Sequence, residues 1–263
     1  MSRKALFFDI DGTLLDTVSR TVPESANRAI AIARECGHLV FVNTGRSNSE
    51  LREIKTMVDP DGWLCGCGTY LEIGGEVVYH RIMPPEQAER ICEEAAAADM
   101  DCFLEGSEHC YVKTRSSRFP LGMRMRGING IKIRYLEDGE PCGIVEKFCV
   151  LTDEKSHKER FFRQIGDQIT VIDRGEGFYE CVPAGHSKAT AIDAVLERYG
   201  LSLEDAYVFG DSTNDIAMFE HAPNAVLMGT HDKALEPYAT FVTKNVEDDG
   251  IWYAMEQLGL LKP

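Results

Sequence analysis

The chain has 263 residues, which is enough for one large domain or two modest ones. It carries 28 Lys and Arg against 43 Asp and Glu, a formal net charge of −15, and so lacks the basic composition of a general nucleic-acid binder. No apolar run approaches the roughly 20 residues that a membrane helix needs, so we expect neither nucleic acid nor membrane as a partner.

The amino-terminal pattern alternates between strands and helices. It predicts a strand over 4–8, a helix over 23–36, a strand over 38–43, a helix over 49–57 and a short strand over 61–65. This alternation is typical of a parallel sheet with helices on both faces. Two further strands, over 70–73 and 76–79, flank Gly74-Gly75 and predict a hairpin.

From about residue 83 the pattern changes character. It predicts a helix over 86–98, strands over 101–105, 109–114, 131–136 and 147–152, a helix over 155–166, and strands over 168–173 and 177–182. Short strands in succession favour antiparallel pairing, so we expect an α+β insert over 83–183. The flanking segments, 1–82 and 184–263, would form the other domain.

The alternating pattern resumes after the insert. It predicts a helix over 188–199, a strand over 206–209, a helix over 213–220, strands over 225–228 and 241–243, and a helix over 249–258. The fold class that we predict is therefore α/β, with a doubly wound parallel sheet as the core and an inserted second domain.

Two aspartates follow the first strand, in Asp9-Ile10-Asp11-Gly12-Thr13. Alternate residues of an extended segment point the same way, so both carboxylates can face one volume at the strand's carboxyl end, where open α/β sheets bind ligands. Close carboxylates favour a shared cation, and Mg²⁺ suits a site of few carboxylates completed by water and phosphate oxygens. A simple Asx turn at the strand end is the structural alternative.

Polar residues also follow later strands of the predicted core. Thr44-Gly45-Arg46 ends the strand over 38–43, and Asp211 and Asp215 follow the strand over 206–209. Because the carboxyl ends of parallel strands meet at one edge, these groups are expected near the first two aspartates. An acid in a first helical turn, such as Asp215, is also favourable without any ligand.

Lys188 opens the helix over 188–199, directly after Gly185-His186-Ser187. A helix N-terminus attracts anions, and a Lys there adds a charge for phosphate. The helix dipole disfavours a cation at that end, so the position of Lys188 calls for a negative partner. A solvated Lys without a role is the alternative.

The four segments, in this order, resemble the four motifs of the haloacid dehalogenase (HAD) superfamily. Thr44-Gly45-Arg46 and the run from Gly210 to Met218 resemble its Cof-like branch, subfamily IIB, which comprises sugar-phosphate phosphatases with a large inserted cap. The resemblance implies a Rossmann-like HAD core and an α+β cap of the C2B type. Cys67-Gly68 departs from the Asn-Gly expected near that point of the branch.

What the resemblance implies is a Mg²⁺-dependent phosphomonoester hydrolase that acts on a small phosphorylated metabolite, such as a sugar phosphate, through an aspartyl-phosphate. The implied roles are nucleophile for Asp9, acid and base for Asp11, phosphate binding for Thr44 and Lys188, Mg²⁺ binding for Asp9, Asp11 (through its carbonyl) and Asp211, substrate binding for Gly12, Gly45, Arg46 and Asn214, and support for Asp215.

Two alternatives stay open. Asp11 argues against the pumps and the haloacid dehalogenases of the superfamily, which lack this second acid, but a sugar phosphomutase of the phosphomannomutase type shares the layout. A non-catalytic phosphosugar-binding protein on the same fold is the second alternative. The insert also holds a basic cluster that is a candidate for reading an acidic substituent of the substrate: Arg115, Arg118, Arg124, Arg126 and Arg134.

Nine cysteines, an odd number, argue against a secreted disulfide framework. We therefore expect reduced, mostly buried thiols and a cytoplasmic protein. Oligomeric state is expected to be monomer or homodimer.

Overall fold

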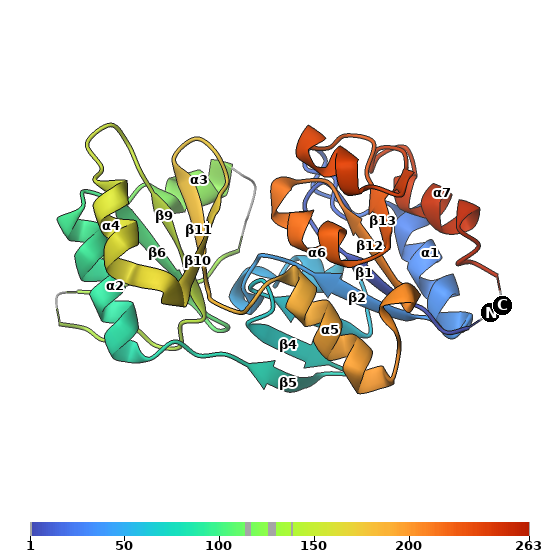
Figure 1. Ribbon diagram of the computed structural model, residues 1–263, viewed down its shortest axis with the longest axis horizontal. Coiled ribbons are helices and arrows are strands. Elements are labelled where there is room, and N and C mark those ends of the chain that lie inside the picture. The colour runs from blue at the N-terminus through green and yellow to red at the C-terminus, as the bar shows by residue number, and fades with distance from the viewer. Residues whose placement is uncertain (1, 114–116, 126–129, 138, 263) are drawn as a thin grey trace. The chain divides into compact units, whose positions relative to one another are not determined.

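The computed structural model describes residues 2–113, 117–125, 130–137 and 139–262 (Figure 1). Its contacts divide the chain into two compact units. The first unit comprises Met1–Gly45, Ile54–Val78 and Ser187–Pro263, and the second comprises Arg46–Glu53 and Tyr79–His186. The division into domains at 82/83 and 183/184 stays a prediction.

An eight-stranded sheet forms the first unit, with β5 ending at the start of the second. Its strand order is β14 (Phe241–Val242), β13 (Asn224–Leu227), β12 (Ala206–Gly210), β1 (Ala5–Phe8), β2 (Leu39–Asn43), β3 (Gly62–Cys65), β4 (Tyr70–Ile73) and β5 (Glu76–His80). The strands from β14 to β3 pair in parallel, and β4 pairs antiparallel to β3. This arrangement confirms the predicted α/β class with a parallel sheet.

Helices cover both faces of this sheet. They are α1 (Glu24–Glu35), α5 (Lys188–Tyr199), α6 (Ile216–His221) and α7 (Gly250–Gln257). Phe7 of β1 packs in one hydrophobic cluster with residues of α5 and α6, including Ile192 and Met218. Successive strand residues point to opposite faces, and Leu6 and Phe8 are also fully buried. An all-apolar strand such as β1 is therefore stable only between two helical layers, with its carboxyl end left for polar residues.

A six-stranded sheet forms the second unit. Its order is β10 (Ile169–Asp173), β11 (Phe178–Pro183), β9 (Lys147–Leu151), β6 (Asp101–Glu105), β7 (Cys110–Val112) and β8 (Ile133–Tyr135). Pairing is antiparallel except between β7 and β8, as expected for an α+β insert. Residues of α2 (Pro85–Ala97) and α4 (Lys158–Ile165) pack with one face of this sheet, and residues of α3 (Phe119–Met125) pack with the other.

Two elements differ from the prediction. The helix predicted over 49–57 is wrong, because the structure has only two short 3₁₀ turns there, Asn48–Glu50 and Ile54–Thr56. Residues up to Glu53 pack with the second unit and residues from Ile54 onward with the first, so tertiary contacts override the local helical pattern. The helix α3 was not predicted, since Pro120 and Gly122 obscure its pattern, although Pro is tolerated in a first turn.

All nine cysteines lie within the described residues as thiols and not as disulfides, and seven of them are buried, which agrees with the prediction of reduced, mostly buried thiols. Within the described residues, no helix is both long enough and apolar enough to cross a membrane.

A group of buried charged side chains lies in the second unit. Lys147 Nζ is 2.8 Å from both Glu105 Oε2 and Glu180 Oε1. Nearby, Glu50 Oε2 accepts hydrogen bonds from the Ser47 N–H at 2.7 Å and the Ser47 hydroxyl at 2.9 Å. Burial, together with the negative charge of Glu105, raises the pKa of Glu50 to about 8. The carboxyl of Glu50 is therefore protonated over much of the neutral range.

Glu50→Gln is expected to raise the melting temperature more at pH 8 than at pH 5. Above the ordinary pKa of 4.5 the unfolded chain releases a proton that the folded protein keeps, so wild-type stability falls as pH rises toward 8. The loss should be on the order of 3 kcal/mol by pH 8, and the neutral amide avoids it. Thermal melts from pH 5 to 8 measure the difference. The exposed Glu154→Gln is the control, and a wild-type-to-variant difference that does not change with pH would contradict the prediction.

Candidate active site

The site lies at the point of the core sheet where the strand order reverses direction, next to β1. From β1 the chain proceeds to β2 on one side, whereas β12 pairs with β1 on the other side. In open α/β sheets such a switch point leaves a crevice at the carboxyl ends of the strands. Asp9 directly follows β1 and Asp211 directly follows β12, and the Asp9 N–H donates to the Phe209 carbonyl at 3.0 Å. The two acids therefore flank this crevice.

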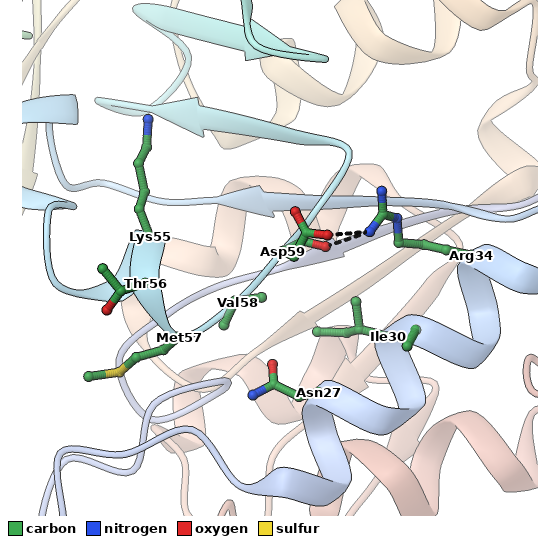
Figure 2. A pocket seen from close by; sticks show the side chains of 9 residues that line it. Asn27, Ile30, Arg34, Lys55, Thr56, Met57, Val58 and Asp59 are labelled. Carbon is green, nitrogen blue, oxygen red and sulfur yellow. Dashed lines mark hydrogen bonds and ion pairs between the residues drawn. The ribbon is translucent and has the colours of Figure 1, made fainter.

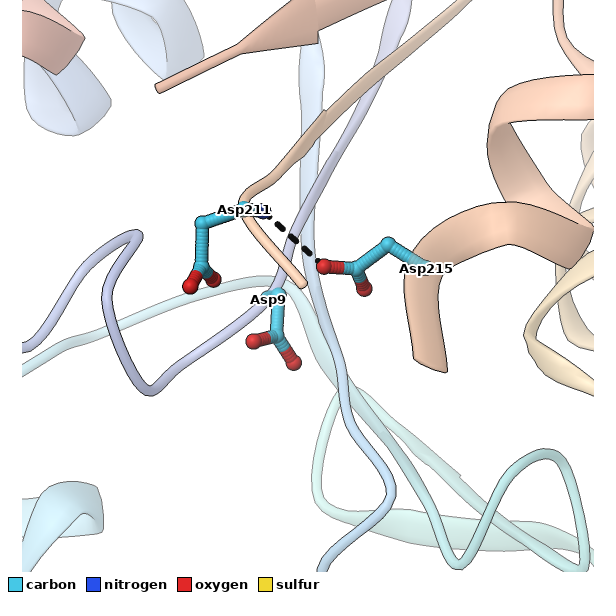
Figure 3. A group of neighbouring side chains, drawn as sticks. All are labelled: Asp9, Asp211 and Asp215. Carbon is cyan, nitrogen blue, oxygen red and sulfur yellow. Dashed lines mark hydrogen bonds between the residues drawn. The ribbon is translucent and has the colours of Figure 1, made fainter. Parts of the chain in front are cut away.

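Three carboxylates converge at this point, from Asp9, Asp211 and Asp215 (Figure 3). One oxygen from each lies within 4.8 Å of the others. Burial raises the pKa of Asp9 to about 7, with Lys188 opposing the shift. Burial, reinforced by the charges of Asp9 and Asp215, raises the pKa of Asp211 to about 9. Burial and the neighbouring carboxylates thus favour the neutral forms of these acids, and nearby positive charge opposes that effect.

Lys188 is buried and contacts two of the acids. Its Nζ is 2.5 Å from Asp9 Oδ1 and 2.5 Å from Asp215 Oδ1. Burial alone would lower the pKa of Lys188, but the carboxylates of Asp215 and Asp9 raise it above the ordinary value. The sequence called for a negative partner at this helix start, and the structure supplies two. A permanently charged ammonium therefore lies beside Asp9.

Both carboxylate oxygens of Asp215 accept hydrogen bonds within the protein. While Oδ1 contacts Lys188, Oδ2 accepts the backbone N–H groups of Asp211 at 3.0 Å and Ser212 at 3.1 Å. Both oxygens are thus already engaged, which favours a supporting role over a ligand role. Gly210 is needed beside it, because an added Cβ there would lie 2.6 Å from Asp215 Oδ2.

Asp211 is positioned by the turn after β1. The Thr13 hydroxyl donates to Asp211 Oδ1 at 3.1 Å. Gly12 has φ +82°, and a Cβ at Gly12 would lie 2.4 Å from Asp211 Oδ2. The Asp-Gly-Thr turn therefore uses Gly both for its backbone conformation and for the close approach of the acid.

Gly12→Ala is expected to lower kcat/KM by at least about tenfold, because the new methyl group must displace the Asp211 carboxylate. Gly37→Ala is the matched control, since Gly37 has φ +88° but no atom within 4 Å of the added Cβ. Both variants should lose on the order of 1 kcal/mol from backbone strain. Steady-state kinetics and thermal melts separate the two effects, and equal activity of the two variants would contradict the assignment.

The other predicted residues lie as follows. Thr44 directly follows β2 and is 2% exposed, and its backbone N–H donates to the Leu64 carbonyl at 2.8 Å. The Asp11 side chain is 40% exposed. Asn214 Oδ1 accepts a hydrogen bond from the Ser212 hydroxyl at 2.8 Å.

The first unit ends its first segment at Gly45, and Arg46 belongs to the second unit. The role that the resemblance implies for Arg46 therefore stays a prediction.

The basic cluster predicted in the insert is only partly described. Arg115 and Arg126, and the side chain of Arg124, lie outside the described residues. Arg118 pairs with Asp101 at 3.1 Å, and Arg134 pairs with Glu140 at 2.6 Å. Both arginine side chains are about half exposed, so these are surface ion pairs of small energetic weight.

Residues that the sequence did not single out also shape the site. The buried Asn43 side chain donates from Nδ2 to the Lys188 carbonyl at 2.9 Å and so ties β2 to the start of α5. Thr13 and Gly210 support the acids as described above. The available signal was weak: Asn43 is the single polar residue of an otherwise apolar strand, and only its position next to Thr44 could have drawn notice.

The donor set fits a hard divalent cation. Three carboxyl groups at the ends of β1 and β12 lie close together, and two of them, those of Asp9 and Asp211, have raised pKa values that a bound cation would lower again. Lys188 neutralises only part of this charge. The arrangement can therefore hold a metal ion and an anion side by side.

Comparison with known proteins gives consistent matches over nearly the whole chain. A family model described as haloacid dehalogenase-like hydrolase matches residues 6–255. The chain is 30% identical over 268 aligned residues to "Putative phosphatase YkrA" of Bacillus subtilis (strain 168), with 100% of both chains covered.

Solved structures agree. The HAD phosphatase BT1666 from Bacteroides thetaiotaomicron has a TM-score of 0.83 and 25% identity, and the match covers 98% of this chain and 96% of that one. The HAD subclass IIB sugar phosphatase BT4131 has a TM-score of 0.80 and 26% identity, and the match covers 98% and 99%. These findings confirm the resemblance, the fold class and the expected enzyme class. The chain belongs to the haloacid dehalogenase-like hydrolase family.

Proposed function

We propose that this protein is a Mg²⁺-dependent phosphomonoester hydrolase that acts on a small phosphorylated metabolite, a sugar phosphate, through an aspartyl-phosphate on Asp9. The observation that carries the proposal is the contact of buried Asp9 with the Lys188 ammonium, beside Asp211, at the carboxyl ends of β1 and β12. Phosphoryl transfer needs a nucleophile and fixed positive charge at one point, and this contact supplies both.

The reaction would take two steps. In the first, a carboxylate oxygen of Asp9 bonds to phosphorus, the ester P–O bond breaks, and the leaving oxygen takes the proton of Asp11. In the second, Asp11 takes a proton from water and the water oxygen bonds to phosphorus. The bond between phosphorus and the Asp9 carboxylate oxygen then breaks to release phosphate. The same carboxyl group thus acts first as acid and then as base.

The remaining residues bind and orient. Lys188 and Thr44 would hold phosphoryl oxygens, where charge stabilisation carries most of the catalysis. Asp9, Asp211 and the Asp11 carbonyl would hold Mg²⁺, whose charge would neutralise phosphoryl oxygens. Asp215 would keep Lys188 in place. Further substrate contacts are proposed for Gly12, Gly45, Arg46 and Asn214.

The substrate class rests on the relatives. BT4131 is named as a sugar phosphatase, and its match covers 98% of the present chain. Nine cysteines that form no disulfide and a net charge of −15 support a cytoplasmic enzyme whose partner is the small-molecule substrate, not nucleic acid.

Phosphate release from a panel of metabolite phosphoesters, with Mg²⁺ and with chelator, tests the proposal. We expect turnover of at least one sugar phosphate with Mg²⁺ and none with chelator. Release that is unaffected by chelator would contradict the metal site. Turnover that yields a phosphate isomer and requires a bisphosphate activator would identify a phosphomutase. Binding of sugar phosphates without any turnover would identify a non-catalytic protein.

A further inference from the structure

The loop between β1 and α1 holds Arg20 in an unusual backbone conformation. Arg20 has φ +61°, in the left-handed region that Asn and Gly favour over other residues. Asp16 organises the loop around it. Its carboxylate accepts the N–H groups of Val18 and Ser19 at 2.9 and 3.1 Å, and its carbonyl accepts the Arg20 N–H at 2.9 Å. A strained position that the surrounding loop enforces is a reason to look for a role of its side chain.

The Arg20 side chain turns toward Asp11. Its Nη1 is 3.9 Å from Asp11 Oδ1, which is beyond hydrogen-bond distance. Both Nε and Nη1 are buried, and among the described residues neither has a hydrogen-bond partner. Buried guanidinium N–H groups that form an ion pair but no hydrogen bond recover only part of the free energy lost with their hydrating water. An acceptor from outside the chain would remove this penalty.

The proposed role of Asp11 indicates which part of a bound substrate lies near Arg20. In the proposed reaction Asp11 protonates the ester oxygen of the leaving group, so a donor beside Asp11 lies next to the leaving group and not the phosphorus. We propose that Arg20 is a specificity-determining residue that donates hydrogen bonds to an acceptor oxygen of the leaving group, such as a hydroxyl near the ester carbon. This inference rests on the proposed function and deepens it.

A matched pair of substrates tests this assignment. Glycerol 3-phosphate and propyl phosphate share a three-carbon chain, but only the first carries hydroxyls near the ester. Wild-type protein is expected to prefer glycerol 3-phosphate in kcat/KM. Arg20→Asn should lower kcat/KM for glycerol 3-phosphate about tenfold or more and change that for propyl phosphate by less than about twofold. Arg20→Lys, which keeps one charged donor, should recover part of the loss.

Asn is the chosen replacement because it tolerates left-handed backbone, so the loop should keep its conformation. Arg20→Gly, which relieves the strain, is the second variant, and circular dichroism and melting temperatures check the fold of both. Arg198→Asn provides the same substitution on an exposed position of α5 and should leave the substrate preference unchanged.

The outcomes separate the two proposals. Equal losses for both substrates would show that Arg20 acts through Asp11 alone, and would overturn the inference. Unchanged kinetics, or a wild type without preference for glycerol 3-phosphate, would overturn it as well. If wild-type protein releases phosphate from neither substrate nor from p-nitrophenyl phosphate with Mg²⁺, the proposed function fails first and the inference falls with it.

Discussion

Asp9→Asn is expected to lower kcat at least about 10⁴-fold, the largest effect of any single substitution in this protein. The amide has nearly the shape of the carboxylate but lacks its charge and its nucleophilic oxygen, so the first bond to phosphorus cannot form. It also removes one of the three carboxylates that converge at the site. Steady-state phosphate release with Mg²⁺ measures the loss.

Asp205→Asn is the matched control for Asp9→Asn. Asp205 also pairs with a lysine of the first unit, Lys4 at 2.7 Å, but it directly precedes β12 and so lies at the opposite end of that strand from Asp211. It should keep full activity with a small loss of stability. Turnover by Asp9→Asn within tenfold of the wild type, with the control also active, would show that Asp9 is not the nucleophile.

Lys188→Met is expected to damage both activity and stability. It should lower kcat/KM by about 10²–10³-fold, because the charge beside the phosphoryl group is lost. It should also destabilise the fold by about 3–5 kcal/mol, because Asp9 and Asp215 remain buried without their shared cation. Activity assays and chemical denaturation, both with chelator and with Mg²⁺, measure the two effects.

Two further variants test whether the stability loss of Lys188→Met comes from its buried contacts with Asp9 and Asp215. Lys4→Met removes an ion pair whose side chains are about one-fifth exposed, so it should lose less than about 1 kcal/mol. Combining Asp9→Asn with Lys188→Met should destabilise less than the sum of the two single changes, since one uncompensated charge has gone. Additive losses, or a Lys188→Met protein as stable as Lys4→Met, would contradict the buried contact.

The strand-end residues could be predicted from the sequence because the order and direction of the strands alone decide where those residues lie. Asp9 and Asp211 each end an apolar strand, and parallel strands bring their carboxyl ends to one edge. The predicted need of Lys188 for a negative partner follows from the helix dipole, and the structure places Asp9 and Asp215 against it. Their catalytic roles remain proposals.

Other features depend on contacts that local patterns do not encode. The segment over 49–57 has helical residues, but it divides between two units at Glu53 and Ile54 and forms only short turns. Arg20 lies beside Asp11 in a loop whose backbone N–H groups donate to the Asp16 carboxylate, and no local pattern indicates this arrangement. Asn43 became visible only through its bond to the Lys188 carbonyl.

The first unit also has a surface pocket that the local sequence pattern does not indicate. It has a volume of about 300 Å³ and lies between α1 and the segment over 55–59 (Figure 2). Arg34 lines it, but its guanidinium already pairs with Asp59 at 2.9 Å and Asp61 at 3.1 Å. The charges of Arg34, Asp59 and Asp61 are thus largely compensated by one another.

The most direct test of the account is to find the phosphoryl group on Asp9. Asp11→Asn protein with Mg²⁺ and p-nitrophenyl phosphate, whose leaving group needs little protonation, should form the aspartyl-phosphate but hydrolyse it slowly for lack of a base. After rapid acid quenching, mass spectrometry should find one added phosphoryl group on the peptide that contains Asp9. Phosphate release at the wild-type rate without any such modification, or modification of another residue, would contradict the mechanism.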